Sequence, residues 1–199
     1  MASDLSFACD CGTVTGAMHV IAGDGEHIVC HCTDCQNLAH HLGHAERLLD
    51  AHGGTSLYQT RCARMRIDTG RDRLACVHMT DGSTLRWYAA CCRIPLFNTV
   101  ATGKLPFITV QLGACDPAAR DRLLGPPRGH LFTHEATGDA SALPKMSMVT
   151  LMRRFFVRAI KDIVSGDRRR SALFDAKTLE PIAKPHRLTD EEKLGLPHR

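Results

Sequence analysis

The sequence is poor in aromatic residues and has no long apolar run. Aromatic side chains make up 5% of its 199 residues, and Trp87 is the single tryptophan. No stretch approaches the roughly 18 apolar residues that a membrane-spanning helix needs. The first residues, MASDLSFACDCG, lack the basic and apolar regions of a secretory signal. These absences predict a cytoplasmic protein with no membrane partner and a modest core of small and aliphatic side chains.

The sequence also lacks a strong net charge. Its formal charge is +4 at pH 7, and its apolar and charged fractions, 44% and 23%, are ordinary for a globular protein. The positive charge is concentrated between Lys145 and Arg170, where eight residues are basic and two are acidic. Such a segment can contact nucleic acid or an acidic partner. The favoured interpretation is a solvated helix face, which makes nucleic acid an unlikely partner.

The pattern of residues divides the chain into two parts. Residues 5–115 are expected to be mainly β, because short runs of strand-forming residues alternate with turns rich in Gly, Asp and Ser. A helix is expected over Cys35–Leu49, where leucines recur at helical spacing. The expected strands are Thr13–Val20, His27–Cys30, Ser56–Thr60, Arg64–Asp68, Leu74–Met79, Thr84–Ala89 and Phe107–Leu112.

Residues 116–199 are expected to form a C-terminal extension. A stretch rich in Pro and Gly precedes a predicted helix at about residues 143–165, and Gly166 is a plausible stop for that helix. Its apolar stripe could pack on its own domain or on a partner, and Phe155 and Phe156 are interpreted as core. The remainder is predicted to be an irregular tail that wraps the domain or is partly disordered. The stripe consists of Val149, Met152, Phe156, Ile160 and Ile163.

Ten cysteines are the most unusual feature of the chain. In a reducing compartment, cysteines in C-x-C and C-x-x-C spacing more often bind metal or do redox chemistry than form disulfides. Cys62, Cys76 and Cys115 stand alone and are interpreted as buried small hydrophobes. The others form three groups: Cys9 with Cys11, Cys30 with Cys32 and Cys35, and Cys91 with Cys92.

The spacing of these groups predicts one or two zinc ions. Three thiols within the six residues Cys30–Cys35 can hold one face of a tetrahedron and leave the fourth position open, as in catalytic zinc sites. Cys9, Cys11 and the Cys91–Cys92 pair would form a second, closed site. Gly12 favours the turn after Cys11 because glycine tolerates positive φ. Consecutive side chains on a strand point to opposite faces, so Cys91 and Cys92 can share an ion only if the backbone turns there.

At this point the sequence resembles the glutathione-dependent formaldehyde-activating enzyme and centromere protein V family. The resemblance rests on C-x-C-G from Cys9, C-x-C-x-x-C-Q from Cys30 to Gln36, and a cysteine followed by x-x-Pro-Leu from Cys92 to Leu96. It spans residues 5 to about 112. It implies a zinc-stabilised, β-tent-like domain of small antiparallel sheets that joins a small thiol such as glutathione to formaldehyde.

The resemblance also implies roles for the cysteines. Cys9, Cys11 and Cys92 would hold a structural zinc, and Cys30, Cys32 and Cys35 would hold the catalytic one. The chain departs from the family pattern C-x-x-C-G at the third motif. Ala89 stands in place of the first cysteine and Arg93 in place of the glycine, while Cys91 is extra. The structural site could use both cysteines through a tight turn, recruit another ligand or be absent.

Three functions follow from the sequence. The first is a carbon–sulfur lyase-type enzyme acting on adducts of a small thiol with an aldehyde, in which zinc would hold and activate the thiol. The second is a zinc-stabilised binding module without catalysis, and the third is redox sensing through the cysteines. His31 and Asp34 are candidates for proton transfer, although His31 could simply be exposed and Asp34 could cap the following helix. His40, His41 and His44 are interpreted as exposed, with a smaller expectation that one closes the site.

Overall fold

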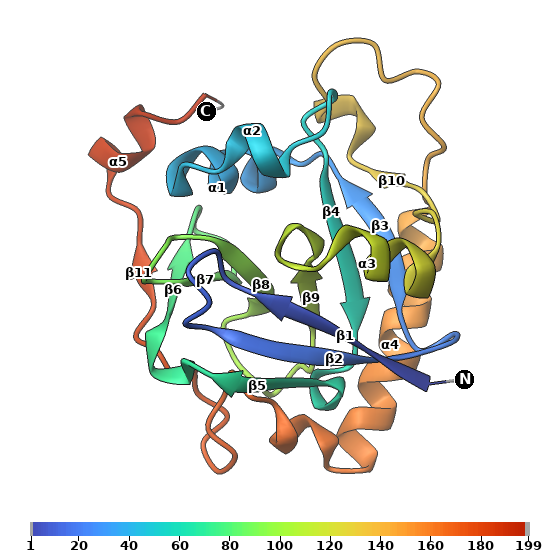
Figure 1. The fold of residues 1–199 in the computed structure, drawn as a ribbon, viewed down its shortest axis with the longest axis vertical. Coiled ribbons are helices and arrows are strands. Elements are labelled where there is room, and N and C mark those ends of the chain that lie inside the picture. Colours follow the sequence, from blue (N-terminus) through green and yellow to red (C-terminus); the bar gives the residue numbers. More distant parts are fainter. Residues whose placement is uncertain (1, 198–199) are drawn as a thin grey trace.

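The computed structural model describes residues 2–197 and is mainly β, with two sheets and a few helices (Figure 1). The smaller sheet has the strand order β1-β2-β5 and is antiparallel throughout. Its close packing requires glycine at position 16, where a Cβ atom would lie 2.3 Å from the Arg66 carbonyl oxygen. The strands are β1 (Ala2–Ala8), β2 (Thr15–Ile21) and β5 (Met65–Thr69).

The larger sheet has eight strands in the order β10-β3-β4-β9-β8-β7-β6-β11. Neighbouring strands are antiparallel except at the two edges, where β10 runs parallel to β3 and β11 parallel to β6. The part of the chain after residue 115 therefore completes both edges of this sheet. The strands are β3 (Glu26–Cys30), β4 (Thr55–Thr60), β6 (Leu74–His78), β7 (Thr84–Ala89), β8 (Pro95–Val100), β9 (Ile108–Gln111), β10 (His130–Leu131) and β11 (His186–Arg187).

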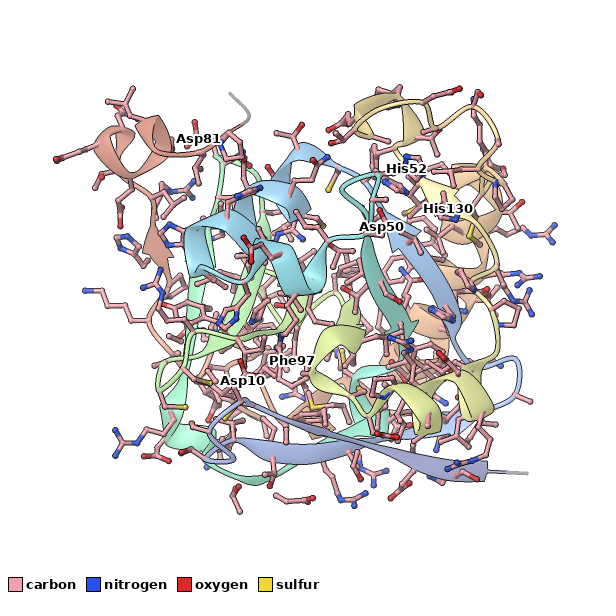
Figure 2. All side chains as sticks on the ribbon, turned by 45° about the horizontal axis from the view of Figure 1, so that its top comes forward. Asp10, Asp50, His52, Asp81, Phe97 and His130 are labelled. Carbon is pink, nitrogen blue, oxygen red and sulfur yellow. The ribbon has the colours of Figure 1, made fainter. Side chains whose placement is uncertain are left out.

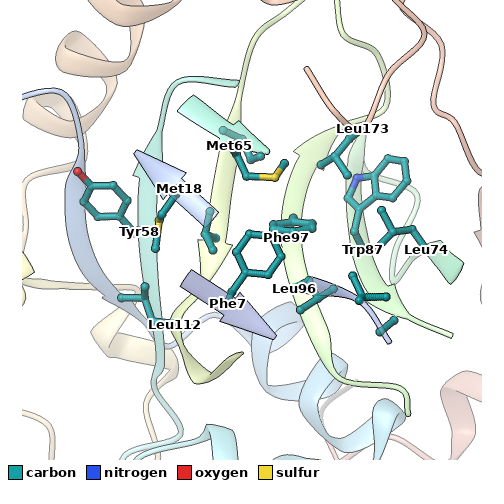
Figure 3. Close-up of a cluster of buried hydrophobic side chains, with 14 of the residues drawn as sticks. Phe7, Met18, Tyr58, Met65, Leu74, Trp87, Leu96, Phe97, Leu112 and Leu173 are labelled. Atoms are coloured by element: carbon teal, nitrogen blue, oxygen red, sulfur yellow. The ribbon is translucent and has the colours of Figure 1, made fainter. Parts of the chain in front are cut away.

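The main core lies between the two sheets (Figure 3). Phe7 of β1 meets Phe97 of β8 edge to face, with ring centroids 5.2 Å apart. Trp87 is fully buried, and its indole N–H donates to the Thr99 hydroxyl at 2.8 Å, which satisfies its one polar atom. The tail contributes Phe174, whose ring packs on the edge of Trp87. A sheet-to-sheet core therefore forms despite the few aromatic residues.

All seven predicted strands are confirmed to within two residues at either end. The fold is mainly β as expected, but eight strands in one sheet with parallel edges differ from small antiparallel sheets. The tent-like arrangement and the boundary at residue 115 stay predictions, and residues 198–199 of the predicted extension lie outside the described part. Within residues 2–197, no helix is both long and apolar enough to span a membrane.

Two helix predictions need correction. The helix expected over Cys35–Leu49 is two helices, because Gly43 adopts φ 81° and ends the first of them. The helix expected from about residue 143 begins at Met148, because the chain around Pro144 and Met146 forms backbone hydrogen bonds with His130 instead. The helices are α1 (Thr33–Leu42), α2 (Ala45–Leu48), α3 (Pro117–Leu124), α4 (Met148–Val164) and α5 (Asp190–Leu194).

Candidate metal centre

Four cysteines meet at one end of the two sheets. Cys9 and Cys11 lie in the turn between β1 and β2, and Cys91 and Cys92 lie in the turn between β7 and β8. Their four sulfur atoms lie within 4.8 Å of one another. The Sγ of Cys11 is 3.5 Å from Cys9 and 3.2 Å from Cys91. Four sulfurs bound to one zinc would be ~3.8 Å apart, since each Zn–S bond is about 2.3 Å. This four-cysteine cluster could hold a metal ion.

In the first turn of the four-cysteine cluster, hydrogen bonds favour the thiolate form of cysteine. Gly12 N–H donates to the Cys9 carbonyl at 2.9 Å, and Gly12 adopts φ 73°, as its position predicted. The Val14 N–H donates to the Cys9 sulfur at 3.1 Å. Hydrogen bonding to Thr13 lowers the pKa of the exposed Cys11 thiol to about 6. The turn therefore supplies donors to sulfur before any metal binds.

The second turn explains how two consecutive cysteines join one cluster. The chain reverses direction between Ala89 and Ile94, where Arg93 N–H donates to the Ala89 carbonyl at 2.7 Å. Arg93 adopts φ 62°, the left-handed conformation that glycine favours. Ala89 is fully buried in the core. Cys91 thus lies where the sequence pattern lacked a ligand, because the tight turn brings it beside Cys9 at 3.7 Å.

The three histidines downstream of Cys35 lie outside both cysteine clusters. His44 Nε2 is 2.9 Å from the Cys92 carbonyl oxygen, so its ring contacts the backbone of the second turn. His40 is exposed and His41 is partly buried. Among residues 2–197, no histidine joins either cysteine cluster. The smaller expectation, that a downstream histidine closes the Cys30–Cys35 site, is therefore wrong.

Cys30, Cys32 and Cys35 form a second cluster where β3 ends and α1 begins. Their sulfur atoms also lie within 4.8 Å of one another, and those of Cys30 and Cys32 are 3.4 Å apart. Cys35 N–H donates to the Cys32 carbonyl at 2.9 Å, which closes the turn that gathers the three thiols. Glu135 caps α1 by accepting from the Thr33 N–H at 2.7 Å. This three-cysteine cluster could also hold a metal ion.

Arg86 is a candidate functional residue that the sequence did not reveal. It lies on β7, is 7% exposed, and its Nη1 is 3.5 Å from the Cys35 sulfur. Its Nη2 is 3.4 Å from Asp34. Hydrogen bonds from Cys30 and Cys32, together with the Arg86 charge, lower the pKa of the Cys35 thiol. Zinc with three thiolates would carry −1, and the Arg86 guanidinium would balance that charge. The alternation of β7 places Arg86 on the opposite face from Leu85 and Trp87, but no signal in the sequence identifies the cluster as its partner.

We expect Arg86→Gln to weaken metal binding at the three-cysteine cluster by roughly 10- to 100-fold, the usual effect of removing a group that supports metal ligands. The physical reason is the loss of the positive charge beside Cys35. Competition with a chromophoric chelator would measure it. Arg73→Gln, a change at an exposed arginine before β6, is the matched control and should leave the affinity unchanged. Equal affinities in Arg86→Gln and the native protein would contradict this role.

A cavity of about 480 Å³ opens directly on the three-cysteine cluster. The Arg86 and Asp34 side chains lie in its wall beside the thiols. Eight apolar residues contribute most of the remaining wall. They are Ile28, Leu57, Phe107, Leu131, Phe132, Met148, Leu151 and Met152. Among residues 2–197, no fourth Cys, His or carboxylate completes this cluster. The three thiols therefore face a space large enough for a small molecule.

The two candidate proton-transfer residues differ from expectation. His31 is fully buried rather than exposed, with Nε2 2.9 Å from His130 Nδ1 and Nδ1 3.0 Å from the His52 carbonyl oxygen. Figure 2 shows His52 and His130 together with Asp50 at this side of the molecule. Asp34 does not cap α1, because Cys32 occupies the N-cap position. Asp34 instead reaches Arg86 and the cavity.

The three isolated cysteines lie apart from both clusters. Cys62, Cys76 and Cys115 are all buried, which confirms their interpretation as small hydrophobic residues. Burial raises the pKa of each thiol to about 12. Such thiols stay protonated and inert at neutral pH.

Comparison with known proteins adds a family but no activity. No curated protein matches the chain. A crystal structure of a Rhodobacter sphaeroides protein from a structural genomics programme is similar at 14% identity, covering 57% of this chain and 89% of that one, with a TM-score of 0.42. A family model described as a family of unknown function, DUF6151, matches residues 1–184. The chain therefore belongs to the family of unknown function DUF6151.

Proposed function

We propose that this protein is a zinc enzyme of the carbon–sulfur lyase type, which makes or cleaves the adduct of a thiol and an aldehyde. The main observation that supports this proposal is the difference between the two cysteine clusters. The three-cysteine cluster faces a cavity and lacks a fourth ligand among the described residues, whereas the four-cysteine cluster is complete. An open position is typical of catalytic zinc and a closed one of structural zinc. The motif resemblance around Cys30–Gln36 supports the same reaction.

Zinc at the three-cysteine cluster would favour the thiolate form of an incoming thiol, which is its nucleophilic form. In the forward direction the sulfur bonds to the aldehyde carbon, and the proton lost by the thiol ends on the new hydroxyl group. Cleavage reverses both steps. Asp34 is the proton carrier we assign, because its carboxylate lines the cavity beside the cluster. Arg86 holds that carboxylate in place at 3.4 Å.

The cavity wall favours an apolar substrate over glutathione itself. Among residues 2–197, Arg86 is the only cationic residue in that wall, and it already pairs with Asp34 and Cys35. Asp34 and Glu135 add negative charge to the wall. The two carboxylates of glutathione would meet these acidic groups without a free cation. We therefore infer that the thiol is neutral and apolar.

The proposal is tested by metal content and turnover. Protein purified without chelator should contain two zinc ions per chain. It should consume an apolar aldehyde only when an alkyl thiol is present. Cys32→Ser should lose one zinc and reduce turnover at least about 100-fold, because one ligand of the open site is gone. Cys76→Ser, outside both clusters, is the control and should keep both zincs and the activity.

Several results would contradict the proposal. If the folded protein contains no metal, the proposal loses its basis. Redox chemistry then becomes the better interpretation of the cysteines. Two zincs without turnover of any thiol–aldehyde pair would favour a non-catalytic binding module. Turnover that survives in Cys32→Ser would place the reaction at another site.

A further inference from the structure

Helix α4 exposes an apolar face. Among the described residues, eleven large hydrophobic side chains are exposed, and eight of them belong to this one helix. Phe156 is 50% exposed and Ile160 is 59% exposed. The predicted stripe thus faces solvent, which corrects the interpretation of Phe156 as core. The eight are Met148, Val149, Met152, Phe156, Val157, Ile160, Ile163 and Val164.

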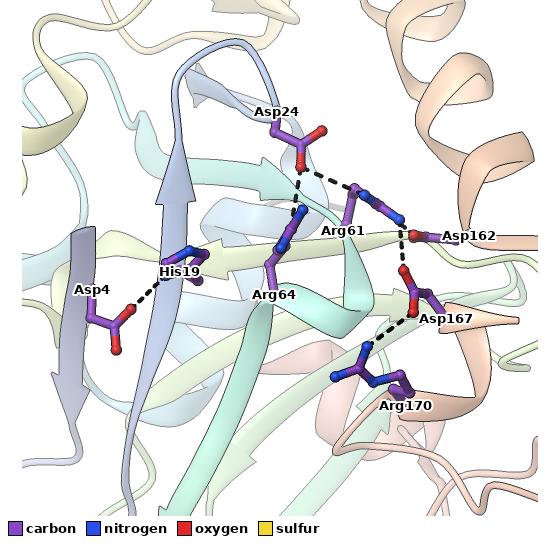
Figure 4. A network of polar contacts seen from close by, with 8 residues as sticks. All are labelled: Asp4, His19, Asp24, Arg61, Arg64, Asp162, Asp167 and Arg170. Carbon is purple, nitrogen blue, oxygen red and sulfur yellow. Dashed lines mark hydrogen bonds and ion pairs between the residues drawn. The ribbon is translucent and has the colours of Figure 1, made fainter. Parts of the chain in front are cut away.

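The orientation of α4 is fixed by charges on its inner face. Arg158 is 5% exposed and donates to Gln59 at 2.5 Å and to Glu26 at 3.5 Å. Asp162 is fully buried and accepts from Arg61 at 2.6 Å (Figure 4). Rotating the helix to bury its apolar face would break these ion pairs and bring both charges to the surface. The exposed apolar face is therefore a consequence of contacts that the fold specifies.

The exposed face carries positive charge and no negative charge. Arg153 and Lys161 are exposed on α4. The acidic residues of this segment turn inward, Asp162 to Arg61 and Asp167 to the same guanidinium at 2.9 Å. An apolar face that carries Arg153 within it and Lys161 beside it complements a surface that is apolar beneath and anionic on top.

We propose that α4 lies in the headgroup layer of an anionic membrane surface, with its apolar side chains at the acyl boundary and Arg153 and Lys161 at lipid phosphates. This site is independent of the proposed catalytic function. The expectation of no membrane partner rests on the lack of a spanning segment, and a helix that lies on the surface needs none. The same helix reaches the cavity mouth, where Met148 and Met152 belong both to the wall and to the exposed face.

A second copy of the chain and a groove on a partner protein both fit the apolar face of α4 less well than a membrane surface. An antiparallel pair of α4 helices centred on Val157 would set Arg153 of each copy opposite Lys161 of the other, and like charges repel. A partner groove takes one stripe of side chains at helical spacing. Here consecutive residues such as Phe156 and Val157 are both exposed. At 3.6 residues per turn, the apolar arc covers about half of the helix circumference.

Co-sedimentation of the full chain with lipid vesicles tests the membrane proposal. One set of vesicles is phosphatidylcholine alone, and the other is phosphatidylcholine mixed with phosphatidylglycerol. Binding to the mixed vesicles should exceed binding to the neutral ones and should weaken as salt rises. The triple variant Val149→Gln/Phe156→Gln/Ile160→Gln should bind at least about tenfold more weakly. Arg153→Gln/Lys161→Gln should lose roughly fivefold per charge. Leu194→Gln, at another exposed apolar residue, should bind like the native chain.

Each variant should keep the native melting temperature and zinc content, because the substituted side chains are exposed. Equal binding to both vesicle types, or none to either, would overturn the proposal. So would a stable dimer in sedimentation velocity that dissociates in the triple variant, which would make a second copy the occupant. Salt-sensitive binding to duplex DNA that displaces the vesicles would assign the face to nucleic acid instead.

Discussion

Cys9→Ala is expected to unfold the protein or to lower its free energy of unfolding by several kcal/mol. Cys9 is one of four converging thiols, and its sulfur lies 3.5 Å from Cys11 and 3.7 Å from Cys91. Structural zinc contributes about 10–16 kcal/mol of apparent binding free energy in small peptides. Folded domains are usually stable by only about 5–15 kcal/mol. Losing even part of the metal contribution therefore decides whether the native state survives.

Cys115→Ala is the matched control. Cys115 is buried like Cys9, at 6% against 3% exposed, and the substitution is the same. Cys115 belongs to neither cluster, so only the modest cost of a small cavity is expected. Urea unfolding of both variants, with and without a chelator, measures the difference. A chelator should destabilise Cys115→Ala more than Cys9→Ala, because Cys9→Ala has only the metal of the three-cysteine cluster left to lose. Equal free energies of unfolding for both variants would show that the four-cysteine cluster holds no stabilising metal.

Arg61→Leu is expected to cost about 3–5 kcal/mol of stability at neutral pH, because it leaves a buried carboxylate without its partner. Arg61 is 9% exposed and sits among three acidic side chains (Figure 4). It donates to Asp162 at 2.6 Å and to Asp167 at 2.9 Å, and it lies 3.8 Å from Asp24. Asp162 is fully buried, so its carboxylate is the one most destabilised by the loss of Arg61.

The cost of Arg61→Leu should shrink as the pH falls. Burial already raises the pKa of Asp162 above its usual value of 3.8, and Arg61 opposes that rise. Without Arg61 the pKa of Asp162 rises further in the folded state. A folded acid with a raised pKa binds more protons than the unfolded chain, so stability is lost as the pH rises through that range. Urea unfolding at neutral pH and near pH 4 measures the change.

Two further variants make the Arg61 result interpretable. Arg61→Leu/Asp162→Asn removes both charges and should recover part of the stability, since no unpaired carboxylate remains. Arg66→Leu removes an arginine that is 55% exposed and pairs with Asp4 at the surface. Such exposed pairs contribute at most about 1 kcal/mol. If Arg61→Leu proves no more costly than Arg66→Leu, the buried network is not what fixes α4.

The local parts of the fold and site were predictable from sequence. Strands with a regular alternation, such as Thr84–Ala89, are found where the pattern places them. The strand β8 was missed because nearly every one of its residues is buried, so no alternation marks it. The cysteine motifs were readable because each group of ligands is contiguous. The position of Arg86 beside the cluster was not readable, because its neighbours in the sequence do not reveal its partner. Cys35 is 51 residues away in sequence, yet its sulfur lies 3.5 Å from Arg86.

The orientation of α4 was the largest departure from the sequence pattern. An apolar stripe normally marks the buried face of a helix. Here the buried face includes Arg158 and Asp162, whose partners Glu26 and Arg61 lie more than a hundred positions earlier. Periodicity within the helix cannot reveal partners at that distance. The tight turn at Arg93 was one of three alternatives that the sequence left open, because a non-glycine residue occupies its positive-φ position.

The two cysteine clusters differ in when they can be completed during synthesis. The three-cysteine cluster lies within six consecutive residues, so its ligands emerge from the ribosome together. The four-cysteine cluster joins Cys11 to Cys91 across 80 positions, and closing so long a loop costs chain entropy before any metal contact repays it. Cys9 and Cys11 would therefore stay free thiols until the β7–β8 hairpin has been made. Among the cysteines of the two clusters, the thiols of Cys9 and Cys11 would thus be exposed to oxidation for longest during synthesis.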